Sequence, residues 1–348
     1  MHDAPQRTDA PPTSAPPAGR HATGSNDAQP QMSLDEVHDL AGRIHAAVSR
    51  VIEGKSDAVR TAIIVLLAEG HLLIEDVPGV GKTMLAKSLA KSIDGTMRRV
   101  QFTPDLLPSD ITGVSVFNQD TRTFEFRPGA VFANLVVGDE INRASPKTQS
   151  ALLECMEEAQ VTVDGTTYRL ARPFMVMATQ NPIEMEGTYP LPEAQRDRFM
   201  ARISMGYPTA NAELAMLDTH GESNPLDRLA PVTDAETVAA AIARVAHIYA
   251  SPALRQYVVD IVTATRNTAA LRLGASPRAA LSLLRAARAN AALERRDHVI
   301  PEDVQTIALP VLSHRVILSA DQQHLRGGAG EVLGQLLQRV RVPAPSER

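Results

Sequence analysis

At 348 residues, 44% of them hydrophobic, the chain is long enough to form about two domains with sizeable apolar cores. Its formal net charge of −5 argues against a broad nucleic-acid-binding surface, and its 3% of aromatic residues argue against a platform for stacking single-stranded bases. The single cysteine, Cys155, excludes an intramolecular disulfide and suits a reducing compartment.

The two ends of the chain have the composition of disordered segments. Residues 1–32 contain six prolines and no Leu, Ile, Val or Phe, so they bury too little apolar surface to offset the entropy of ordering. They also lack the apolar region of a secretory signal, and the longest apolar run, residues 62–68, is far shorter than the roughly 20 residues that span a bilayer. We therefore expect disordered tails over 1–32 and 344–348 in a cytoplasmic protein with no membrane insertion.

From Leu34 onward, helical and strand patterns alternate. An amphipathic helix follows Ser33 as its N-cap, and a second helix covers residues 57–68. Further helices are expected from Met84 and from Pro146. Short apolar runs predict buried strands at 71–75, 98–102, 133–139 and 173–181. Strands that alternate with helices predict a parallel sheet covered on both faces.

Two hairpins and a helical segment complete the predicted organisation. The hairpins cover residues 115–126 and 161–170, the second one turning at Asp164-Gly165. Beyond residue 208 the chain is rich in Ala, Leu and Arg, with helical periodicity and no strong strand pattern. We predict a core domain over 33–208 and a helical domain over 209–343.

The stretch LLIEDVPGVGKTMLAKSLA, residues 72–90, has the order of a phosphate-binding loop, with a strand, a glycine-rich turn and a helix. The N–H groups at a helix N-terminus favour anions, Lys82 adds a positive charge, and the Thr83 hydroxyl suits Mg²⁺. Gly79 and Gly81 stand where the backbone must approach the phosphates. We expect nucleotide contacts from Val77, Pro78, Gly79, Val80, Gly81, Lys82, Thr83 and Met84.

One residue departs from the loop pattern G-x-x-x-x-G-K-[ST]. The first glycine should be residue 76, which is aspartate. We interpret position 76 as one where the loop needs mainly a backbone conformation, because aspartate tolerates unusual φ better than most residues. On this interpretation Asp76→Gly leaves nucleotide binding nearly unchanged, whereas Gly81→Ala damages it.

The run LVVGDE, residues 135–140, is an apolar strand that ends in two acids. Ligands of open α/β folds bind at the carboxyl edge of the sheet, where these acids are expected to lie. Asp139 is placed to hold Mg²⁺, directly or through water. Glu140 is placed to polarise the attacking water as a general base.

Three further polar residues complete the candidate site. Asn181 ends the strand at 173–181 and is placed to contact a γ-phosphate or the water. In EAQRDRF, residues 193–199, one arginine is expected to reach a neighbouring subunit, and we prefer Arg198 to Arg196. Arg278 lies in the first turn of a helix that follows Ser276 and Pro277, where a cation makes sense if an anion faces it.

Together these segments resemble the MoxR family of AAA+ ATPases. The motifs that carry the resemblance span most of residues 35–318 and read EDVPGVGKTMLA, GDEINRASPKTQSALLECMEE, ATQNPIEMEGTYPLPEAQRDRF and GASPRAALSLLRAA. The hairpin at 115–126 is similar to the insertion in helix 2 of this branch, and the one at 161–170 to the hairpin before the first sensor. The sequence departs from the family pattern at Asp76 and at Gly138, where a bulkier apolar residue is more usual.

The resemblance implies an α/β P-loop core, with a parallel sheet flanked by helices, and a C-terminal helical lid domain. It implies an ATPase with ATP and Mg²⁺ as cofactors, and the adenine is expected against Val51, Ile52, Glu53 and Gly54. The implied roles are Walker A for Lys82 and Thr83, Walker B for Asp139 and Glu140, sensor 1 for Asn181, arginine finger for Arg198 and sensor 2 for Arg278.

The resemblance also implies a homo-oligomeric ring, usually a hexamer, that remodels or matures protein partners, commonly proteins with von Willebrand factor A (VWA) domains. Two alternatives stay open from the sequence. One is a different motor of the same branch, either the ATPase subunit of a metal chelatase or a nucleic-acid-remodelling enzyme. The other is a nucleotide-gated scaffold that does not hydrolyse ATP, against which the intact Asp139-Glu140 pair argues.

Overall fold

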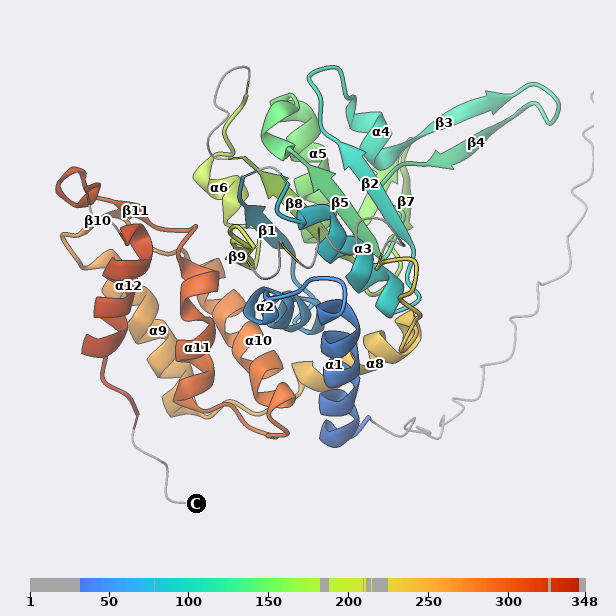
Figure 1. Ribbon diagram of the computed structural model, residues 1–348. Coiled ribbons are helices and arrows are strands. Elements are labelled where there is room, and N and C mark those ends of the chain that lie inside the picture. The colour runs from blue at the N-terminus through green and yellow to red at the C-terminus, as the bar shows by residue number, and fades with distance from the viewer. Residues whose placement is uncertain are drawn as a thin grey trace, which may run out of the picture. The chain divides into compact units, whose positions relative to one another are not determined.

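The computed structural model describes residues 32–77, 79–181, 188–208, 225–324 and 327–343, together with Ala210 and Leu214 (Figure 1). Except for Met32, the tails predicted over 1–32 and 344–348 lie outside the described residues, as does Pro78 of the phosphate loop. The domain boundary predicted at residue 208 adjoins another such segment and stays a prediction.

A parallel five-stranded sheet forms the centre of the α/β part, in the order β2-β5-β8-β1-β9 (Figure 1). Because all neighbouring strands are parallel, their carboxyl ends meet at one edge. The predicted α/β class is confirmed. The strands are β1 (Leu72–Glu75), β2 (Met97–Gln101), β5 (Leu135–Asp139), β8 (Met175–Gln180) and β9 (Ala201–Ile203).

Both faces of this sheet are buried, and side chains along each strand alternate between two apolar clusters. Leu72 and Ile74 belong to the larger cluster, whereas Leu73 between them belongs to the smaller one. Strands β5 and β8 show the same period of two, which explains why they read as continuous apolar runs. Helices α1 (Leu34–Ser49), α2 (Ser56–Leu67) and α3 (Lys82–Ser92) contribute to the larger cluster, and α4 (Pro108–Thr112) and α5 (Pro146–Glu158) to the smaller one.

The C-terminal part is helical and shares the larger cluster with the sheet. Its helices are α8 (Ala235–Ala246), α9 (Pro252–Arg266), α10 (Pro277–Leu293), α11 (Pro301–Leu312) and α12 (Gly328–Arg339). The structure adds an antiparallel pair, β10 (Leu271–Leu273) with β11 (Ile317–Leu318), where no strong strand was expected. Two or three residues are too few to show alternation, so the pairing is set by tertiary contacts.

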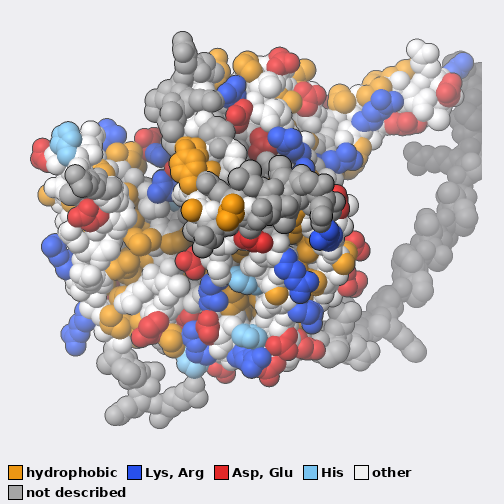
Figure 2. Space-filling model, in the orientation of Figure 1, with side chains coloured by type: hydrophobic (Ala, Val, Ile, Leu, Met, Phe, Trp, Pro, Cys, Tyr) orange, Lys and Arg blue, Asp and Glu red, His pale blue; other side chains and the backbone are white. Residues whose placement is uncertain are grey.

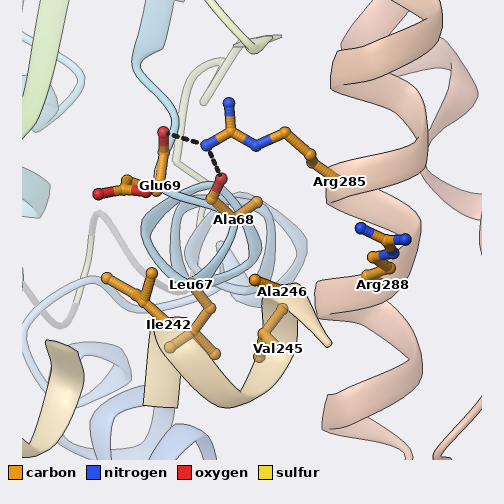
Figure 3. Close-up of a pocket in the computed structure, with 8 residues that line it drawn as sticks. All are labelled: Leu67, Ala68, Glu69, Ile242, Val245, Ala246, Arg285 and Arg288. Carbon is orange, nitrogen blue, oxygen red and sulfur yellow. Dashed lines mark hydrogen bonds between the residues drawn. The ribbon is translucent and has the colours of Figure 1, made fainter. Parts of the chain in front are cut away.

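A cavity of about 350 Å³ lies where α2, α8 and α10 meet (Figure 3). Arg285 of α10 donates from Nη2 to the carbonyl oxygens of Ala68 and Glu69, at 2.5 and 2.7 Å (Figure 3). These are carbonyls left unpaired at the C-terminus of α2, so the arginine caps one helix from another. The cavity lies before the start of β1, at the opposite end of that strand from the phosphate loop.

Two hairpins extend from the α/β part, as predicted. One pairs β3 (Gly113–Asn118) with β4 (Thr123–Pro128), and the other pairs β6 (Gln160–Val163) with β7 (Thr166–Arg169). The first projects away from the sheet (Figure 1), and the two are joined at their bases by the rings of Phe126 and Tyr168, which stack with centroids 4.0 Å apart.

Basic and acidic side chains are interspersed over the face of the molecule shown in Figure 2, in keeping with the small net charge. Among the described residues no helix is long and apolar enough to cross a membrane. Cys155 is buried, and burial raises the pKa of its thiol to about 12, so the thiol stays protonated and unreactive at neutral pH.

His71, just before β1, is buried and makes two hydrogen bonds. Its Nε2 lies 2.9 Å from the carbonyl oxygen of Met156, and its Nδ1 accepts from the backbone N–H of Val176 at 3.0 Å. The second bond requires an unprotonated Nδ1, so the ring is neutral. Burial, together with the charge of Arg285, lowers the pKa of His71 to about 4 although the Met156 bond opposes the shift.

We expect the free energy of unfolding to fall between pH 6.5 and 4. Over that range the histidine of the unfolded state, with an ordinary pKa of about 6.5, becomes protonated, whereas His71 of the folded state stays neutral. The free energy of unfolding should therefore fall by about 3 kcal/mol at most. Urea titrations at pH 8, 6 and 5 should show the loss, and His71→Gln, which keeps a donor and an acceptor, should flatten it. Burial also lowers the pKa of His314, so part of the dependence of the free energy of unfolding on pH should remain in that variant. Identical slopes in the two proteins would contradict this assignment.

Candidate functional site

The phosphate loop connects β1 to α3, as its sequence predicts. Gly79 and Gly81 have φ values of +84° and +89°, and Gly81 is the N-cap of α3. Residues with a Cβ rarely adopt such φ values, so the loop requires glycine at both positions. The first turn of α3 follows directly, and the N–H groups of such a helix end favour anions.

Lys82 points back along this loop rather than into solvent. Its Nζ donates to the backbone carbonyl oxygen of Asp76 at 2.7 Å. The ammonium group is therefore held next to the loop, where an incoming phosphate would meet it. Val77, Val80 and Met84 are all half-buried around the same turn.

The Thr83 hydroxyl and the Asp139 carboxylate meet at the carboxyl edge of the sheet. Thr83 Oγ1 lies 3.5 and 3.4 Å from the two carboxylate oxygens. Asp139 is buried at the end of β5, and it also accepts from Thr179 Oγ1 at 3.3 Å. A hydroxyl beside a carboxylate is a set of hard oxygen ligands that fits Mg²⁺. Arg99 of β2 forms an ion pair with the same carboxylate, its Nε 2.6 Å from Oδ2.

Glu140 follows directly and has left-handed backbone geometry, with φ of +57°. Its backbone N–H donates to Thr179 Oγ1 at 3.0 Å, which fixes the turn after β5. Its carboxylate oxygen Oε2 accepts from Gln101 Nε2 at 2.9 Å and pairs with Arg143 Nε at 3.0 Å. Side chains on both sides of it thus orient the predicted general base.

Gly138, before these acids, has a packing role that the sequence did not reveal. A methyl group on Gly138 would lie 3.0 Å from Cε2 of Phe102, which is closer than most such contacts. Phe102 is fully buried and fills the space that a bulkier residue at 138 would take. The ring of Phe102 thus supplies apolar volume beside Gly138, where the family pattern has a bulkier residue.

Asn181 lies beside the phosphate loop. It follows β8, which pairs in register with β1, and the backbone N–H of Asp76 donates to the Gln180 carbonyl oxygen at 3.2 Å. Asn181 is buried, with 6% of its surface exposed. The structure thus brings Lys82, Thr83, Asp139, Glu140 and Asn181 together at one edge of the sheet.

Asp76 does not have the role expected from the sequence. It is absent from the residues with positive φ, so the backbone does not need an unusual conformation there. Instead its buried carboxylate accepts hydrogen bonds from Ser204 Oγ at 3.0 Å and from the N–H groups of Met205 and Gly206, each at 2.6 Å. Burial alone would raise the pKa of this carboxyl, but these bonds and one from the N–H of Val77 outweigh it and lower the pKa.

Residues 51–54, where the adenine was expected, lie near the loop. The side chains of Ile52 and Met205 both approach Gly81, at 4.0 and 3.8 Å from the place where its Cβ would be. Lys55 Nζ donates to the carbonyl oxygen of Tyr207 at 2.7 Å and ties the two segments together. An apolar surface thus adjoins the phosphate loop on the side of α1 and α2.

The two predicted arginines lie elsewhere, at the amino edge of the sheet. Met200, which precedes β9, donates its N–H to the carbonyl oxygen of His71, which precedes β1. Arg198 is therefore near the start of β1, whereas the phosphate loop follows its end. Arg198 and Arg278 both pair with Glu157 at the end of α5, with Arg198 Nη2 3.2 Å from Oε2. Arg278 does not face the γ-phosphate position of its own chain.

A buried arginine fixes the helical part at this same edge. Arg315 donates to the backbone carbonyls of Asp197 and Phe199, at 3.0 and 2.7 Å, and its Nε lies 3.0 Å from Asp197 Oδ1. Burial lowers the pKa of Arg315 to about 10, yet it stays charged at neutral pH. Ser276 Oγ also donates to Asp197, at 2.7 Å, and this places the start of α10 next to Arg198.

Comparison with known proteins identifies the family. The model of the family described as "ATPase family associated with various cellular activities (AAA)" matches residues 71–201. The model of the family described as "AAA lid domain" matches residues 263–333. Chaperone MoxR1 of Mycobacterium tuberculosis is 41% identical over 339 residues, which cover 94% of this chain and 89% of that relative. The chain belongs to the MoxR family of AAA+ ATPases.

Two other relatives span nearly the same length. The uncharacterised protein YeaC of Bacillus subtilis is 49% identical over 309 residues, 89% of this chain and 97% of YeaC. The crystal structure of a proposed ATPase from Cytophaga hutchinsonii superposes with a TM-score of 0.82 at 37% identity, covering 89% of this chain and 97% of that one. The predicted family, the fold with its lid domain, and the ATPase activity are therefore confirmed.

Proposed function

We propose that this MoxR-family ATPase hydrolyses Mg²⁺-bound ATP between the subunits of a homo-oligomeric ring. The observation that carries the proposal is the separation of the two arginines from the phosphate loop of their own chain. The loop, Asp139 and Glu140 lie at the carboxyl edge of the sheet, and Arg198 and Arg278 lie at the amino edge. A second copy that places its amino edge against the first copy's loop would complete the site.

In this proposal each described residue acts on the nucleotide in a definite way. The N–H groups of Gly79, Val80, Gly81 and Met84 hold the phosphates, and Lys82 adds positive charge. Thr83 and Asp139 would hold Mg²⁺, which neutralises phosphate charge when bound. Glu140 takes the proton from the attacking water, and Asn181 hydrogen-bonds to the γ-phosphate or to that water. Arg198 and Arg278 of the neighbour stabilise the charge that develops.

The adenine would lie against residues 51–54, opposite Met205. Ile52 and Met205 provide apolar contacts next to Gly81. This assignment places the base and the phosphates on adjoining surfaces, with Lys55 bonding the two segments that form the wall.

The proposed work of the cycle is to remodel or mature protein clients. The support is that a relative 41% identical to this chain carries the name Chaperone MoxR1. A hexameric ring and VWA-domain clients remain parts of the proposal that rest on the family resemblance. The cytoplasmic location is a proposal that rests on the composition of the sequence.

The proposal predicts nucleotide-dependent assembly. The Glu140→Gln protein, which should bind ATP without turning it over, is expected to sediment as a ring in the presence of ATP and Mg²⁺. Lys82→Ala, which lacks the phosphate-binding charge, is the matched control and should remain smaller. Wild-type turnover per subunit should rise with protein concentration, because each site needs two chains.

A turnover per subunit that stays constant down to concentrations where the protein is monomeric would contradict hydrolysis between subunits. The assembled Glu140→Gln ring also serves as bait for clients. A true client should be retained with ATP and released without it, and it should not bind Lys82→Ala. Retention of the same proteins by both variants would argue against an ATP-driven client cycle.

A further inference from the structure

We propose that Asp76 is a positioning residue, whose carboxylate locks the segment 204–207 against the phosphate loop and thereby sets the affinity for nucleotide. The inference deepens the proposed nucleotide assignments and rests on the base lying beside residues 51–54. It concerns the one residue of the loop that departs from the glycine pattern.

Asp76 joins two parts of the site through different atoms. Its backbone carbonyl accepts from Lys82 Nζ at 2.7 Å, and its carboxylate accepts from the side chain or backbone of Ser204, Met205 and Gly206. A fourth donor, the backbone N–H of Val77, lies 2.9 Å from the other carboxylate oxygen. Only 8% of the residue is exposed, so little water competes for these donors.

The segment that the carboxylate holds forms a wall of the proposed base site. Met205 extends from it to within 3.8 Å of the Cβ position of Gly81, and the backbone carbonyl oxygen of Tyr207 accepts a hydrogen bond from Lys55 Nζ. Gly206 has a φ of +59°, which lets its N–H and that of Met205 turn toward one carboxylate oxygen. The wall therefore depends on an acceptor at position 76.

A glycine at position 76 cannot provide that acceptor. The N–H groups of Met205 and Gly206 would then be left without their partner in a buried place, and the segment would move to find water or another acceptor. Lys82 would be affected less, because every substitution retains the backbone carbonyl that it binds. The expected loss is in nucleotide affinity, not in the chemical step.

The test measures ADP binding by titration, and KM and kcat for ATP, in wild type, Asp76→Gly, Asp76→Ala and Asp76→Asn. For Gly and Ala we expect the Kd for ADP and the KM for ATP to rise by about tenfold to a hundredfold, the usual effect of stranding buried donors. The kcat at saturating ATP should change by less than about threefold. Asparagine keeps one acceptor oxygen, so Asp76→Asn should fall between wild type and Asp76→Ala.

These variants also separate positioning from charge. If the negative charge mattered through its field alone, Asp76→Asn and Asp76→Ala would be equal, and that result would overturn the proposal. So would Asp76→Gly with wild-type affinity. Ser204→Ala removes only one of the four donors and is mild enough to fold, so it should raise the Kd for ADP less than Asp76→Ala does. An equal or larger rise would also contradict the proposal.

Asp110→Ala is the matched control for a merely structural effect. The Asp110 carboxylate accepts from the N–H of Leu107 at 2.9 Å at the start of α4, and alanine removes this acceptor, so the melting temperature should fall without a change in Kd. Lys82→Ala tests the nucleotide site itself. Loss of binding in Lys82→Ala with normal binding in Asp76→Gly overturns only the present inference, whereas normal binding in Lys82→Ala overturns the proposed site.

Discussion

Replacing Glu140 by glutamine is expected to lower ATP turnover by about 10²–10⁴, the usual contribution of a general base, while ATP binding is retained. An amide cannot take a proton from the attacking water. It still offers an oxygen to Gln101 Nε2 and Arg143 Nε, which hold the carboxylate at 2.9 and 3.0 Å, so the side chain should keep its place. The measurements are phosphate release under saturating Mg²⁺-ATP and a nucleotide titration of the same protein.

Glu236→Gln provides the control, because Glu236 is exposed in the first turn of α8 and loses the same charge far from the phosphate loop. It should leave turnover unchanged. Near-wild-type phosphate release by Glu140→Gln would sink the assignment of Glu140 as the base. Loss of ATP binding in that variant would instead mean that Glu140 contributes to the nucleotide site itself.

Much of the fold could be predicted because it follows from local patterns. Strands such as β5 and β8 are buried on both faces, so they read as apolar runs, and Ser33 and Ser145 cap their helices through bonds to nearby backbone N–H groups. The phosphate loop is a contiguous motif with obligatory glycines. Its prediction needed no knowledge of distant residues.

The parts that could not be predicted depend on which strands become neighbours. Arg99 and Gln101 reach Asp139 and Glu140 because β2 pairs in register with β5, with Gln101 opposite Asp139. Arg99 and Gln101 are two positions apart and so point to the same face of β2. This spacing could predict their contacts with the two acids only once the strand order was known. The Asp76 carboxylate likewise binds residues about 130 positions away, which no local pattern reveals.

Arg278 shows the same limit in the helical domain. Its place in the first turn of α10 predicted that it faces an anion, and in the structure it does face one, the Glu157 carboxylate. Which anion it meets is decided by Arg315, Asp197 and Ser276, which dock the helical domain at the amino edge of the sheet. The chemical expectation was sound, and the partner depended on domain packing.

Replacing Arg198 by alanine is expected to lower turnover by up to about 10³–10⁵, the effect of removing an arginine that stabilises the charge of phosphoryl transfer. Arg278→Ala should lower turnover in the same direction. Neither change should weaken ATP binding to an isolated subunit, because both side chains pair with Glu157 at the amino edge, away from their own phosphate loop. Phosphate release and a nucleotide titration at low protein concentration measure the two effects separately.

Mixing variants then decides whether Arg198 acts across the subunit interface. A subunit with Arg198→Ala retains a working phosphate loop, and a subunit with Lys82→Ala retains Arg198. Each homogeneous protein should be inactive, whereas mixed rings contain interfaces where an intact loop meets an intact arginine, so activity should partly return. Arg198→Ala mixed with Arg198→Lys is the control, since neither subunit offers a guanidinium. If mixing with Lys82→Ala restores no ATP turnover, Arg198 does not act in a neighbour's site. Its pairing with Glu157 would then serve its own chain or only the fold.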